Sequence, residues 1–394
     1  MRLLQEIWCL EDALREVSRA IIHRSSYKEV PLLESVGRVV AEDILASEPV
    51  PHFVRSTMDG YAVRARTTFG ASEAMPAMLT LGGAGVYASA PVLTGGAVSD
   101  EFDAVVMLEY AELLEDGLLL VSRPVAVGEN IMSVGEDVPV NQALVRRGQK
   151  LSIRDIAVLS ALGHAQVRVR DFKVAVMSSG DEIVPITVVP AIGQVRDINS
   201  SLVMGLIRDM GFHADFLGII TDDADLLVSK LVIALATYDA VIISGGSSAG
   251  SYDYTARAMQ RVGSPGVITH GLSIKPGKPT VLGVAGGKLM IGLPGHPLSC
   301  ALTAHVVAAP LLATAAEALI VKRAHFELPL LLPIASVPGR RDIVPVKITQ
   351  GGICPLFAKS AAIRVLADAD GFIEINEQCE GLHAGERVKV EVWR

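Results

Sequence analysis

The spacing of apolar residues changes along the chain, and each change predicts a different kind of structure. Residues 10–24 and 151–162 carry apolar side chains at helical spacing, which predicts two amphipathic helices. In the second helix Ile153, Ile156, Ala157 and Leu159 are expected to face inward. Residues 30–47 have short alternating apolar runs, and residues 79–110 are glycine-rich and β-like. The first half is therefore expected to consist mainly of short strands.

From Lys173 the pattern alternates between continuous apolar runs and longer helical segments. Strands are expected at 173–177, 213–220 and 240–243, and helices at 199–210, 222–235 and 253–262. Repeated βα units of this length predict a parallel, three-layer α/β domain. From about residue 322, short β-like runs separated by proline and glycine predict a small β-barrel or sandwich.

One apolar stretch is long enough to cross a membrane. Residues 298–321 contain only His305 and Glu317 as strongly polar side chains. Pro310 interrupts the stretch, which also follows directly on a strand–turn pattern of the α/β type. We interpret it as a helix buried against the sheet. A mean hydropathy of +0.42 keeps a membrane-embedded protein open as the alternative.

Length, charge and cysteines narrow the class of protein. The 394 residues are enough for two to four domains. The net charge of −8 is spread over interspersed acidic and basic residues, so neither nucleic acid nor a membrane surface is an expected partner. The scattered cysteines, and acidic residues where a signal peptide would be apolar, predict a cytoplasmic protein. These cysteines are Cys9, Cys300, Cys354 and Cys379, and the acidic residues are Glu6, Glu11 and Asp12.

The segment 239–253, DAVIISGGSSAGSYD, is the strongest candidate for chemistry. Its β-branched run 241–243 is typical of a strand buried on both faces, and the polar turn falls at the strand's carboxyl end, where α/β sheets bind ligands. Gly245, Gly246 and Gly250 would allow close approach of an anion, and Asp253 could hold a hard cation. The alternative is an ordinary βα connection with Asp253 as the helix N-cap.

Other polar turns are expected at the same edge of the sheet. They are SSGDE (178–182) and LPGHP (293–297), and the loop KPGKP (275–279) lies in the sequence between the turn 244–253 and LPGHP. Carboxylates for a metal, lysines for oxyanions and glycine turns for phosphate together predict a phosphate-ester site. Each could instead be structural: Asp181 and Glu182 as turn or cap residues, the lysines as solvated surface, His296 as a structural histidine. The Walker A motif is absent from the sequence and no GxGxxG follows a strand, which disfavours P-loop ATPases and dinucleotide dehydrogenases.

The order of these motifs resembles the MoeA family. The motifs are STMDGYAV (56–63), TGG followed by DAVVMLE (94–109), GED (135–137), SSGDE, SGGSSAGSYDY (244–254), KPGKPT (275–280) and LPGHP. The family comprises molybdopterin molybdenumtransferases related to the E domain of gephyrin, and the resemblance covers essentially the whole chain. It implies an enzyme that inserts molybdate into adenylylated molybdopterin with release of AMP, in a magnesium-dependent reaction.

The resemblance also implies an architecture and partners. Residues 1–47 and 141–170 would form a linking domain, 48–140 a β-rich elongated arm, 171–321 the molybdopterin-binding α/β domain, and 322–394 a β-barrel. Helix 10–24 would pack on the α/β domain. The family forms cytosolic homodimers with a cleft between the α/β domain of one subunit and the arm of the other. Contacts with the molybdopterin adenylyltransferase and with cofactor-receiving apo-enzymes are further expectations.

Roles for individual residues follow from the resemblance. Catalytic positions would be Asp59, Thr94 and Asp137 on the arm, facing Glu182, Asp222, Asp253, Lys275 and Lys278. Glu182, Asp222 and Asp253 would hold magnesium or orient molybdate, and the two lysines would neutralise the oxyanion and phosphates. The pterin-linked phosphate would be received by Ser179, Gly180, Gly245, Gly246, Ser247, Gly250, Pro294, Gly295 and Pro297.

The sequence departs from the family pattern at several positions. His296 replaces the usual Asn, Ser251 replaces an acidic residue, Gly271 stands where a basic residue is common, and Met132 and Pro345 lie where arginines are often seen. Fewer positive charges would weaken the binding of an anionic substrate. Two alternatives therefore stay open: a molybdopterin adenylyltransferase, and a non-catalytic pterin-binding or scaffold paralogue.

Overall fold

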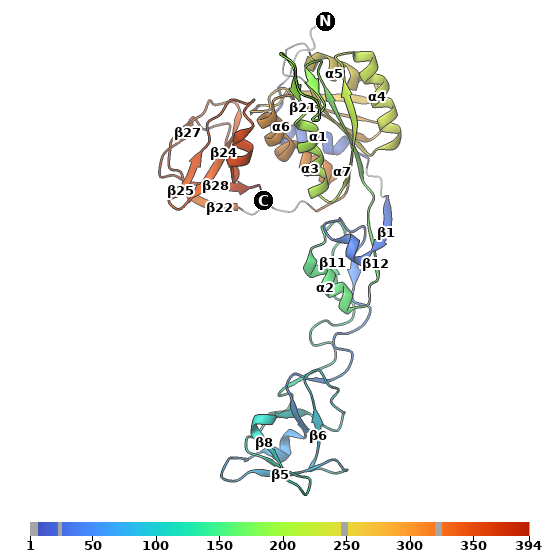
Figure 1. Ribbon diagram of the computed structural model, residues 1–394, viewed down its shortest axis with the longest axis vertical. Coiled ribbons are helices and arrows are strands. Elements are labelled where there is room, and N and C mark those ends of the chain that lie inside the picture. The colour runs from blue at the N-terminus through green and yellow to red at the C-terminus, as the bar shows by residue number, and fades with distance from the viewer. Residues whose placement is uncertain (1–6, 23–25, 246–250, 320–324, 394) are drawn as a thin grey trace. The chain divides into compact units, whose positions relative to one another are not determined.

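The computed structural model of the chain describes residues 7–22, 26–245, 251–319 and 325–393, and it divides into two compact units. The first unit comprises Met1–Glu42, Arg147–Ile153 and Gln166–Arg394, and the second Asp43–Arg146 and Arg154–Ala165. The first contains the α/β domain and a C-terminal β domain, and the second is β-rich (Figure 1). The finer division into four domains stays a prediction.

A six-stranded sheet organises the α/β domain, in the order β16-β13-β17-β21-β20-β18. The strands are β13 (Lys173–Ser179), β16 (His213–Ile220), β17 (Ala240–Gly245), β18 (Pro265–His270), β20 (Val281–Ala285) and β21 (Lys288–Pro294). The first four in the order are parallel, but β20 and β18 are antiparallel to their neighbours. The expectation of a parallel sheet was wrong there, because Gly286 and Gly287 adopt positive φ and join β20 to β21 in a tight hairpin.

Helices cover both faces of this sheet and make three layers (Figure 1). On one face, Val174 and Val176 of β13 pack with α1 (Leu10–Ala20), α3 (Asn199–Asp209), α6 (Pro297–Thr303) and α7 (Ala309–Ala315). On the other, Ala175 and Met177 pack with α4 (Ala224–Thr237) and α5 (Ser251–Arg261). Neighbouring residues of β13 thus enter different cores, which explains why its sequence is continuously apolar.

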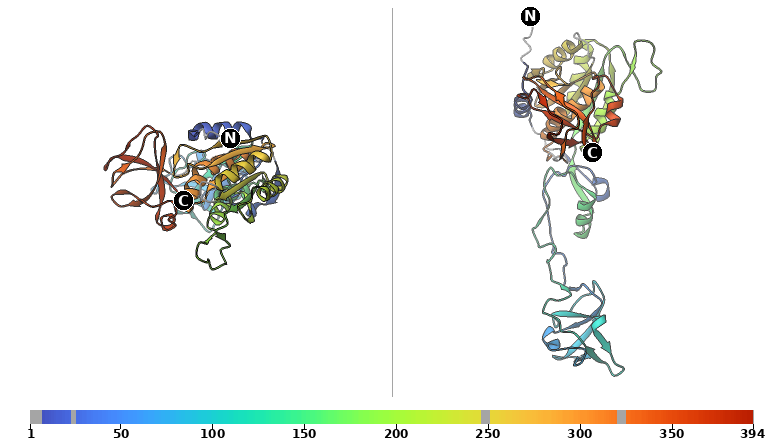
Figure 2. Two further views of the ribbon diagram at one scale, coloured as in Figure 1. Left: turned by 90° about the horizontal axis from the view of Figure 1, so that it is seen from above. Right: turned by 90° about the vertical axis from the view of Figure 1, so that its left-hand side faces the viewer.

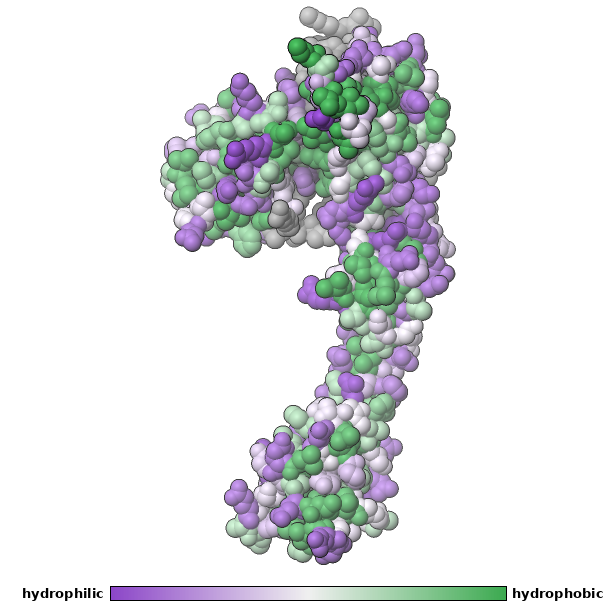
Figure 3. Space-filling model, in the orientation of Figure 1, coloured by the Kyte–Doolittle hydropathy of each residue, from purple (hydrophilic) through white to green (hydrophobic). Residues whose placement is uncertain are grey.

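The apolar stretch after β21 is part of this core. Helices α6 and α7 are joined by a π-helical turn, η4 (Ala304–Ala308). The run Pro297–Ala315 is, in the described part of the chain, the one helix long and apolar enough to span a membrane, and 78% of the tested window is buried inside the protein. The side chains of Leu298, Leu302 and Leu311 lie in the core under the sheet. On the visible face of the α/β domain, hydrophilic and hydrophobic residues are interspersed (Figure 3).

Two short paired strands flank a loop that projects from the α/β domain. Strand β14 (Ile183–Val184) pairs in parallel with β15 (Val195–Arg196), and the segment between them projects from the domain in both views of Figure 2. The first unit also contains a separate two-stranded sheet. In it, β1 (Tyr27–Pro31) pairs antiparallel with β12 (Gln166–Arg170), and β1 is followed by η1 (Leu32–Ser35).

The C-terminal part is a β domain that is joined to the α/β domain by strand pairing. Its sheet has the order β19-β24-β26-β28-β22, with β25 paired to β24. Strand β19 (Ile274–Lys275) lies in the α/β half of the sequence and pairs in parallel with β24, so that Lys275 is opposite Asp342. The remaining elements are β22 (His325–Pro329), β23 (Ile334–Ala335), β24 (Arg341–Thr349), β25 (Gly352–Pro355), α8 (Arg364–Asp368), β26 (Gly371–Ile375), β27 (Gly381–Leu382) and β28 (Arg387–Val392). Closure into a barrel stays a prediction.

The second unit contains a separate sheet of order β7-β4-β6-β5-β9-β8. Its strands are β4 (Gly60–Val63), β5 (Ala77–Leu81), β6 (Ala88–Val92), β7 (Ala104–Met107), β8 (Ala111–Leu113) and β9 (Leu118–Val121). Leu79, Val106 and Leu119 are among the side chains that fill its core. Smaller pairs are β3 (Arg55–Ser56) with β10 (Ile131–Met132), and β2 (Ile44–Leu45) with β11 (Ala143–Val145). The unit also contains η2 (Ala65–Thr68) and η3 (Leu108–Tyr110).

Helix α2 (Ile153–Ala161) forms where the apolar spacing predicted it. Ile156 and Leu159 are buried, as expected. Ile153 is 75% exposed and Ala157 is also exposed, so their inward orientation was wrong. The helix has only nine residues, and it buries a narrow stripe three residues apart rather than the wide face that the pattern suggested.

Candidate functional site

The carboxyl ends of four adjacent parallel strands are level with one another. Ser179 of β13 pairs with Ile220 of β16 on one side and with Gly245 of β17 on the other, and Gly245 pairs with Pro294 of β21. The turns that follow these strands therefore leave the sheet at one edge. This edge brings together the predicted positions Ser179, Gly180, Glu182, Asp222, Gly245, Pro294, Gly295 and, as the first residue of α6, Pro297.

Three carboxylates gather beside β13 and β16. The hydroxyl of Ser179 donates to Asp222 Oδ1 at 3.3 Å, and the backbone N–H of Asp222 donates to Asp181 Oδ1 at 3.1 Å. The carboxylate of Glu182 lies so close to Gly180 that a Cβ there would be 2.8 Å from Oε2. Burial raises the pKa of the Asp222 carboxyl, the charges of Asp181 and Glu182 raise it further, and the Ser179 hydrogen bond lowers it. A cation at this cluster would relieve the repulsion.

The donor set of this cluster fits magnesium. Magnesium prefers carboxylate oxygens and is usually held by one or two of them together with waters and substrate phosphates. Glu182 and Asp222 offer such oxygens at the sheet edge. Within the described residues, no group of three His, Cys, Asp or Glu side chains is arranged to hold a metal alone. The third predicted ligand, Asp253, is the third residue of α5, inside the helix rather than at its N-cap, but its side chain lies outside the described part of the structure.

The glycine turn after β17 is only partly described. Gly246, Ser247 and Gly250 lie outside the described residues. At Gly245 an added Cβ would meet its nearest neighbour, Ser179 Cβ, at 3.6 Å, which is an ordinary van der Waals contact. Packing therefore does not require glycine at position 245. A ligand that approaches the backbone of residue 245 closely would require glycine there.

A cleft of about 550 Å³ lies next to this edge, within the first unit. The KPGKP loop and the LPGHP turn line one part of it, and the C-terminal β domain lines the rest. Its charged lining residues are Lys275, Lys278, Arg340 and Asp342. Volumes of this size are typical of small-molecule sites. The cleft thus collects three cationic side chains and one carboxylate around a space that can hold a ligand.

Asp342 orients two of the three cations. It is 4% exposed, accepts a hydrogen bond from Arg340 Nε at 3.0 Å, and lies 3.9 Å from Lys275 Nζ. Lys278 is exposed and has no carboxylate partner among the described residues. With three cations against one carboxylate, the cleft has an excess of positive charge in a chain that is negative overall. Such a site favours an anion.

Gly277 shapes the KPGKP loop. Its φ of +116° is a conformation that other residues rarely adopt, and a Cβ there would lie 2.4 Å from Thr303 Oγ1 and 2.7 Å from Ile274 Cδ1. The loop can lie against α6 only because this position has no side chain. The two lysines are consequently held on either side of a fixed turn.

Sequence reasoning missed several residues of the cleft. Arg340, Asp342 and Ser360 come from the C-terminal domain, and Ser299 from α6. For His296 the sequence left a structural role open, and in the structure its Nδ1 lies 2.9 Å from the Ser360 hydroxyl across the two domains. Only the local charge in PGRRD, residues 338–342, could have suggested Arg340 or Asp342. The contacts between the two domains join residues far apart in the sequence, as the separation of 64 between His296 and Ser360 illustrates.

The structure also clarifies the departures from the family pattern. Pro345 lines the cleft, but so does Arg340, which supplies a guanidinium there. Gly271 has a φ of +118°, so a basic residue at this position would be strained. Met132 lies opposite Arg55, whose Nη2 is 3.3 Å from the Met132 sulfur. The side chain of Ser251 lies outside the described part of the structure.

In the second unit the predicted residues Asp59 and Thr94 lie together. Asp59 Oδ1 accepts hydrogen bonds from the Thr94 N–H at 2.6 Å and from its hydroxyl at 2.7 Å. These bonds lower the pKa of the Asp59 carboxyl, the backbone bond more than the side-chain bond. Asp137 is exposed in the turn after β10, and its N–H donates to Val50 O at 3.1 Å.

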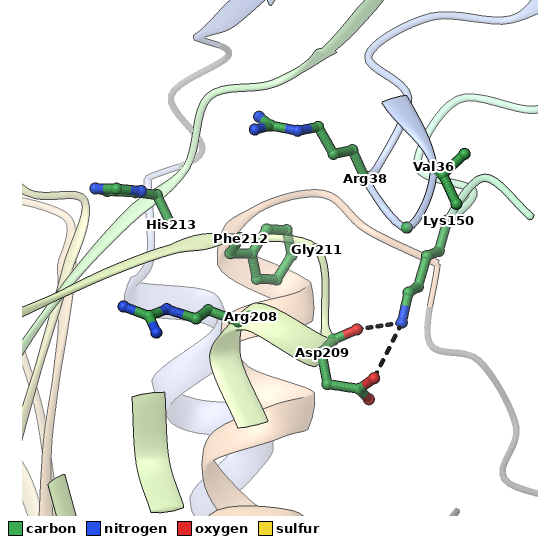
Figure 4. A pocket seen from close by; sticks show the side chains of 9 residues that line it. Val36, Arg38, Lys150, Arg208, Asp209, Gly211, Phe212 and His213 are labelled. Atoms are coloured by element: carbon green, nitrogen blue, oxygen red, sulfur yellow. Dashed lines mark hydrogen bonds and ion pairs between the residues drawn. The ribbon is translucent and has the colours of Figure 1, made fainter. Parts of the chain in front are cut away.

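A second cavity, of about 330 Å³, is lined by Arg38, Lys150, Arg208, Asp209 and His213 (Figure 4). Lys150 Nζ donates to the backbone carbonyl of Asp209 and lies 3.5 Å from its carboxylate. Gly211 packs against Gly37, where a Cβ would be 2.3 Å from the carbonyl oxygen. These contacts attach the segment around Lys150 to the end of α3, and none of the predicted site residues lies in this cavity.

Comparisons with known proteins identify three family regions. Residues 9–163 match the MoeA N-terminal region (domains I and II), residues 175–314 a probable molybdopterin binding domain, and residues 327–393 the MoeA C-terminal region (domain IV). A Methanocaldococcus jannaschii protein named for molybdopterin biosynthesis is 31% identical over 405 aligned residues, covering 99% of each chain. The molybdopterin molybdenumtransferase of Haemophilus influenzae is 30% identical over 381, covering 91% of this chain and 92% of its own.

Solved structures agree with these matches over the full length. A molybdopterin biosynthesis MoeA protein from Pyrococcus horikoshii is 37% identical with a TM-score of 0.83, covering 99% of this chain and 100% of its own. A second MoeA structure from the OT3 strain of that organism is 27% identical with a TM-score of 0.86, covering 98% and 100%. The likeness extends over both compact units, so it is not confined to the common α/β domain.

Proposed function

This chain belongs to the MoeA family, and we propose that, like the relatives named molybdopterin molybdenumtransferases, it inserts molybdenum from molybdate into adenylylated molybdopterin with release of AMP. The observation that carries the proposal is the cleft in which Lys275, Lys278 and Arg340 converge beside the carboxyl edge of the sheet. It offers a place for an oxyanion next to a place for a phosphorylated pterin.

The charges of the cleft suit molybdate. This substrate is a small tetrahedral dianion, and lysine and arginine side chains bind such ions by charge-assisted hydrogen bonds. Asp342 holds Arg340 at 3.0 Å, which fixes the guanidinium in the lining of the cleft before substrate binds. Lys278 is exposed and has no carboxylate partner among the described residues, so its ammonium group is available to the ligand. The Ser299 and Ser360 hydroxyls add neutral donors to the lining.

The sheet edge suits the phosphates of the adenylylated pterin. We assign the pterin-linked phosphate to the turns after Ser179, Gly245 and Pro294, which end three adjacent strands. Glu182 and Asp222 would hold magnesium, which when bound neutralises phosphate charge and makes AMP a better leaving group. Ser179 keeps the Asp222 carboxylate oriented by its hydrogen bond of 3.3 Å.

We further propose that the enzyme is a cytoplasmic homodimer in which the second unit of one subunit completes the site of the other. Asp59, Thr94 and Asp137 would be the residues contributed. The low pKa of Asp59 supports this role, since an ionised carboxylate is available to orient a metal or a donor group. The molybdopterin adenylyltransferase and the cofactor-receiving apo-enzymes are the proposed partners in substrate delivery and product transfer.

The proposal is tested with purified protein, adenylylated molybdopterin, molybdate and magnesium. AMP release, followed by chromatography, is expected for the natural chain and is expected to fall at least about 100-fold in the Lys275→Ala/Lys278→Ala variant, the size of effect for removing charged transition-state contacts. Lys230→Ala removes an exposed lysine from α4 and serves as the matched control. Equal loss in all variants would contradict the assignment of the cleft.

The same preparation separates the remaining alternatives. A molybdopterin adenylyltransferase would release pyrophosphate from ATP in the presence of molybdopterin, and we expect none. A scaffold protein would bind the adenylylated pterin without releasing AMP at any molybdate concentration. Either result would replace the proposed reaction.

A further inference from the structure

We propose that His296 makes oxyanion binding in the cleft dependent on pH, because it determines whether the Ser360 hydroxyl donates its hydrogen to the imidazole ring or to the ligand. This inference rests on the proposed function, since it concerns the same cleft and the same oxyanion. It assigns His296 as a positioning residue that acts through Ser360.

The two side chains meet inside the cleft. Ser360 Oγ lies 2.9 Å from His296 Nδ1, and both residues belong to the lining of the 550 Å³ space. The backbone N–H of Leu298 donates to the Ser360 carbonyl at 3.1 Å, so the two segments are also fixed by their main chains. The hydrogen bond is therefore set by the fold and does not depend on a flexible side chain reaching across.

The hydroxyl has one hydrogen, and the ring decides its direction. When Nδ1 carries no proton, it accepts the hydrogen of Ser360, and the serine presents only lone pairs to the cleft. When Nδ1 carries a hydrogen, either in the other neutral tautomer or in the charged ring, Nδ1–H donates to Ser360 Oγ instead. The serine hydrogen is then free to point at an oxyanion, and the charged ring also adds a positive charge. An anion in the cleft should thus favour the protonated ring, and binding should take up a proton.

The other charged side chains that line the cleft belong to residue types whose ordinary pKa values lie far from neutrality. They are Lys275, Lys278, Arg340 and Asp342, which line the same cleft. Lysine and arginine stay protonated, and carboxylates stay ionised, through neutral pH, whereas histidine is the side chain that changes its charge there. A proton taken up on oxyanion binding between about pH 6.5 and 8.5 is therefore assigned to His296.

A purely structural role predicts a different behaviour. If the bond served only to fix Ser360 and the loop that carries it against α6, replacing His296 would change stability or affinity by one factor at every pH. A proton-linked role changes the slope of affinity against pH. The slope is therefore the decisive readout, and the affinity at a single pH is not.

The experiment measures molybdate binding by titration calorimetry at about pH 6.5, 7.5 and 8.5 in two buffers of different ionisation enthalpy, which reports protons taken up. For the natural chain we expect affinity to fall with rising pH, approaching tenfold per unit where one proton is linked. His296→Asn keeps a polar side chain without the titrating ring, and we expect its affinity to vary less than about twofold over this range. Lys230→Ala should retain the slope of the natural chain.

Ser360→Ala distinguishes the hydroxyl from the ring charge. This variant is expected to bind molybdate more weakly than the natural chain at low pH. It should keep only the part of the slope of affinity against pH that comes from the charge of the His296 ring. A natural chain that binds molybdate with no pH slope and no proton uptake overturns the inference but leaves the proposed function standing. An unchanged slope in His296→Asn also overturns it. Failure of the folded natural chain to bind molybdate at every pH overturns the proposed function itself.

Discussion

Asp59 and Thr94 form a two-point contact in which one carboxylate oxygen accepts both the N–H and the hydroxyl of a single residue, at 2.6 and 2.7 Å. The residues are 35 positions apart and lie in the turns before β4 and after β6. The contact lowers the pKa of an otherwise exposed carboxyl, so Asp59 stays ionised at a pH where an ordinary aspartate begins to protonate.

We expect Thr94→Val to shift the acid limb of the activity profile to higher pH. Valine removes the hydroxyl bond and keeps the N–H bond, so the pKa of Asp59 should rise part of the way to its ordinary value. Because the natural pKa is lowered, the contact stabilises the ionised form above the ordinary pKa of about 3.9 and is lost as pH falls through the lower, native value. Thr94→Ser keeps both donors and should retain the natural profile. An identical acid limb in both variants would contradict the role of the hydroxyl.

We expect Asp222→Asn to stabilise the fold while abolishing magnesium-dependent activity. Burial and neighbouring carboxylates raise the pKa of Asp222, so the native state loses stability as pH rises from the ordinary aspartate value through the raised one. The amide avoids that loss. Because the site is only partly buried and solvent screens the charges, the gain at neutral pH should be at most about 1 kcal/mol.

Urea unfolding at about pH 3 and pH 7 measures this effect, because the difference between the variant and the natural chain should vanish at the lower pH. Asp225→Asn, at an exposed carboxylate paired with Arg261 on the surface, is the comparison variant. A lower stability of Asp222→Asn at neutral pH would mean that the carboxylate cluster is not repulsive.

Two glycine substitutions should separate folding from ligand binding. Gly277→Ala places a Cβ 2.4 Å from Thr303 Oγ1 at a φ of +116°, and we expect a loss of about 1–3 kcal/mol of unfolding free energy. Gly245→Ala meets only ordinary contacts at 3.6 Å, so stability should change by less than about 1 kcal/mol while binding of adenylylated molybdopterin weakens. Thermal unfolding and pterin binding measured on both variants test this; normal pterin binding by Gly245→Ala would exclude a close approach at that turn.

Lys150→Ala should destabilise the attachment seen in Figure 4. The ammonium group donates to the last turn of α3 at Asp209 and is partly shielded, so we expect a loss of about 1 kcal/mol. Lys150→Gln retains a donor and should recover part of the loss. Since the cavity contains none of the proposed catalytic residues, activity per folded molecule should stay unchanged, and hydrogen exchange at the end of α3 should report the local effect.

Much of the sheet edge could be predicted from the strand pattern of the sequence and the turns that follow each strand. A parallel strand places the turn after it at a known edge, so SSGDE and LPGHP could be assigned to one side of the sheet before their contacts were known. The alternating burial of Val174 and Ala175 in two cores likewise follows from a continuous apolar run. The two antiparallel strands were missed because the signal, Gly286-Gly287, was short and had no alternating polar flanks.

The cleft itself was only half predictable. Lys275 and Lys278 were found from their loop, but the pairing of β19 with β24 brings Arg340 and Asp342 to the cleft, and the contact with His296 brings Ser360. Such long-range contacts leave no periodic trace in the sequence. No function could be assigned to His296 from the sequence, because a histidine is recognised as functional by what its ring contacts. In this chain that contact, Ser360, comes from another domain.

The most direct measurement is a single-turnover reaction in which AMP and pterin-bound molybdenum are quantified from the same sample of purified chain. The account predicts that one AMP appears for each molybdenum incorporated, that both require molybdate and magnesium, and that both fall together in Lys275→Ala/Lys278→Ala. AMP released at the same rate without molybdate, or no AMP from folded protein that binds the adenylylated pterin, would contradict it.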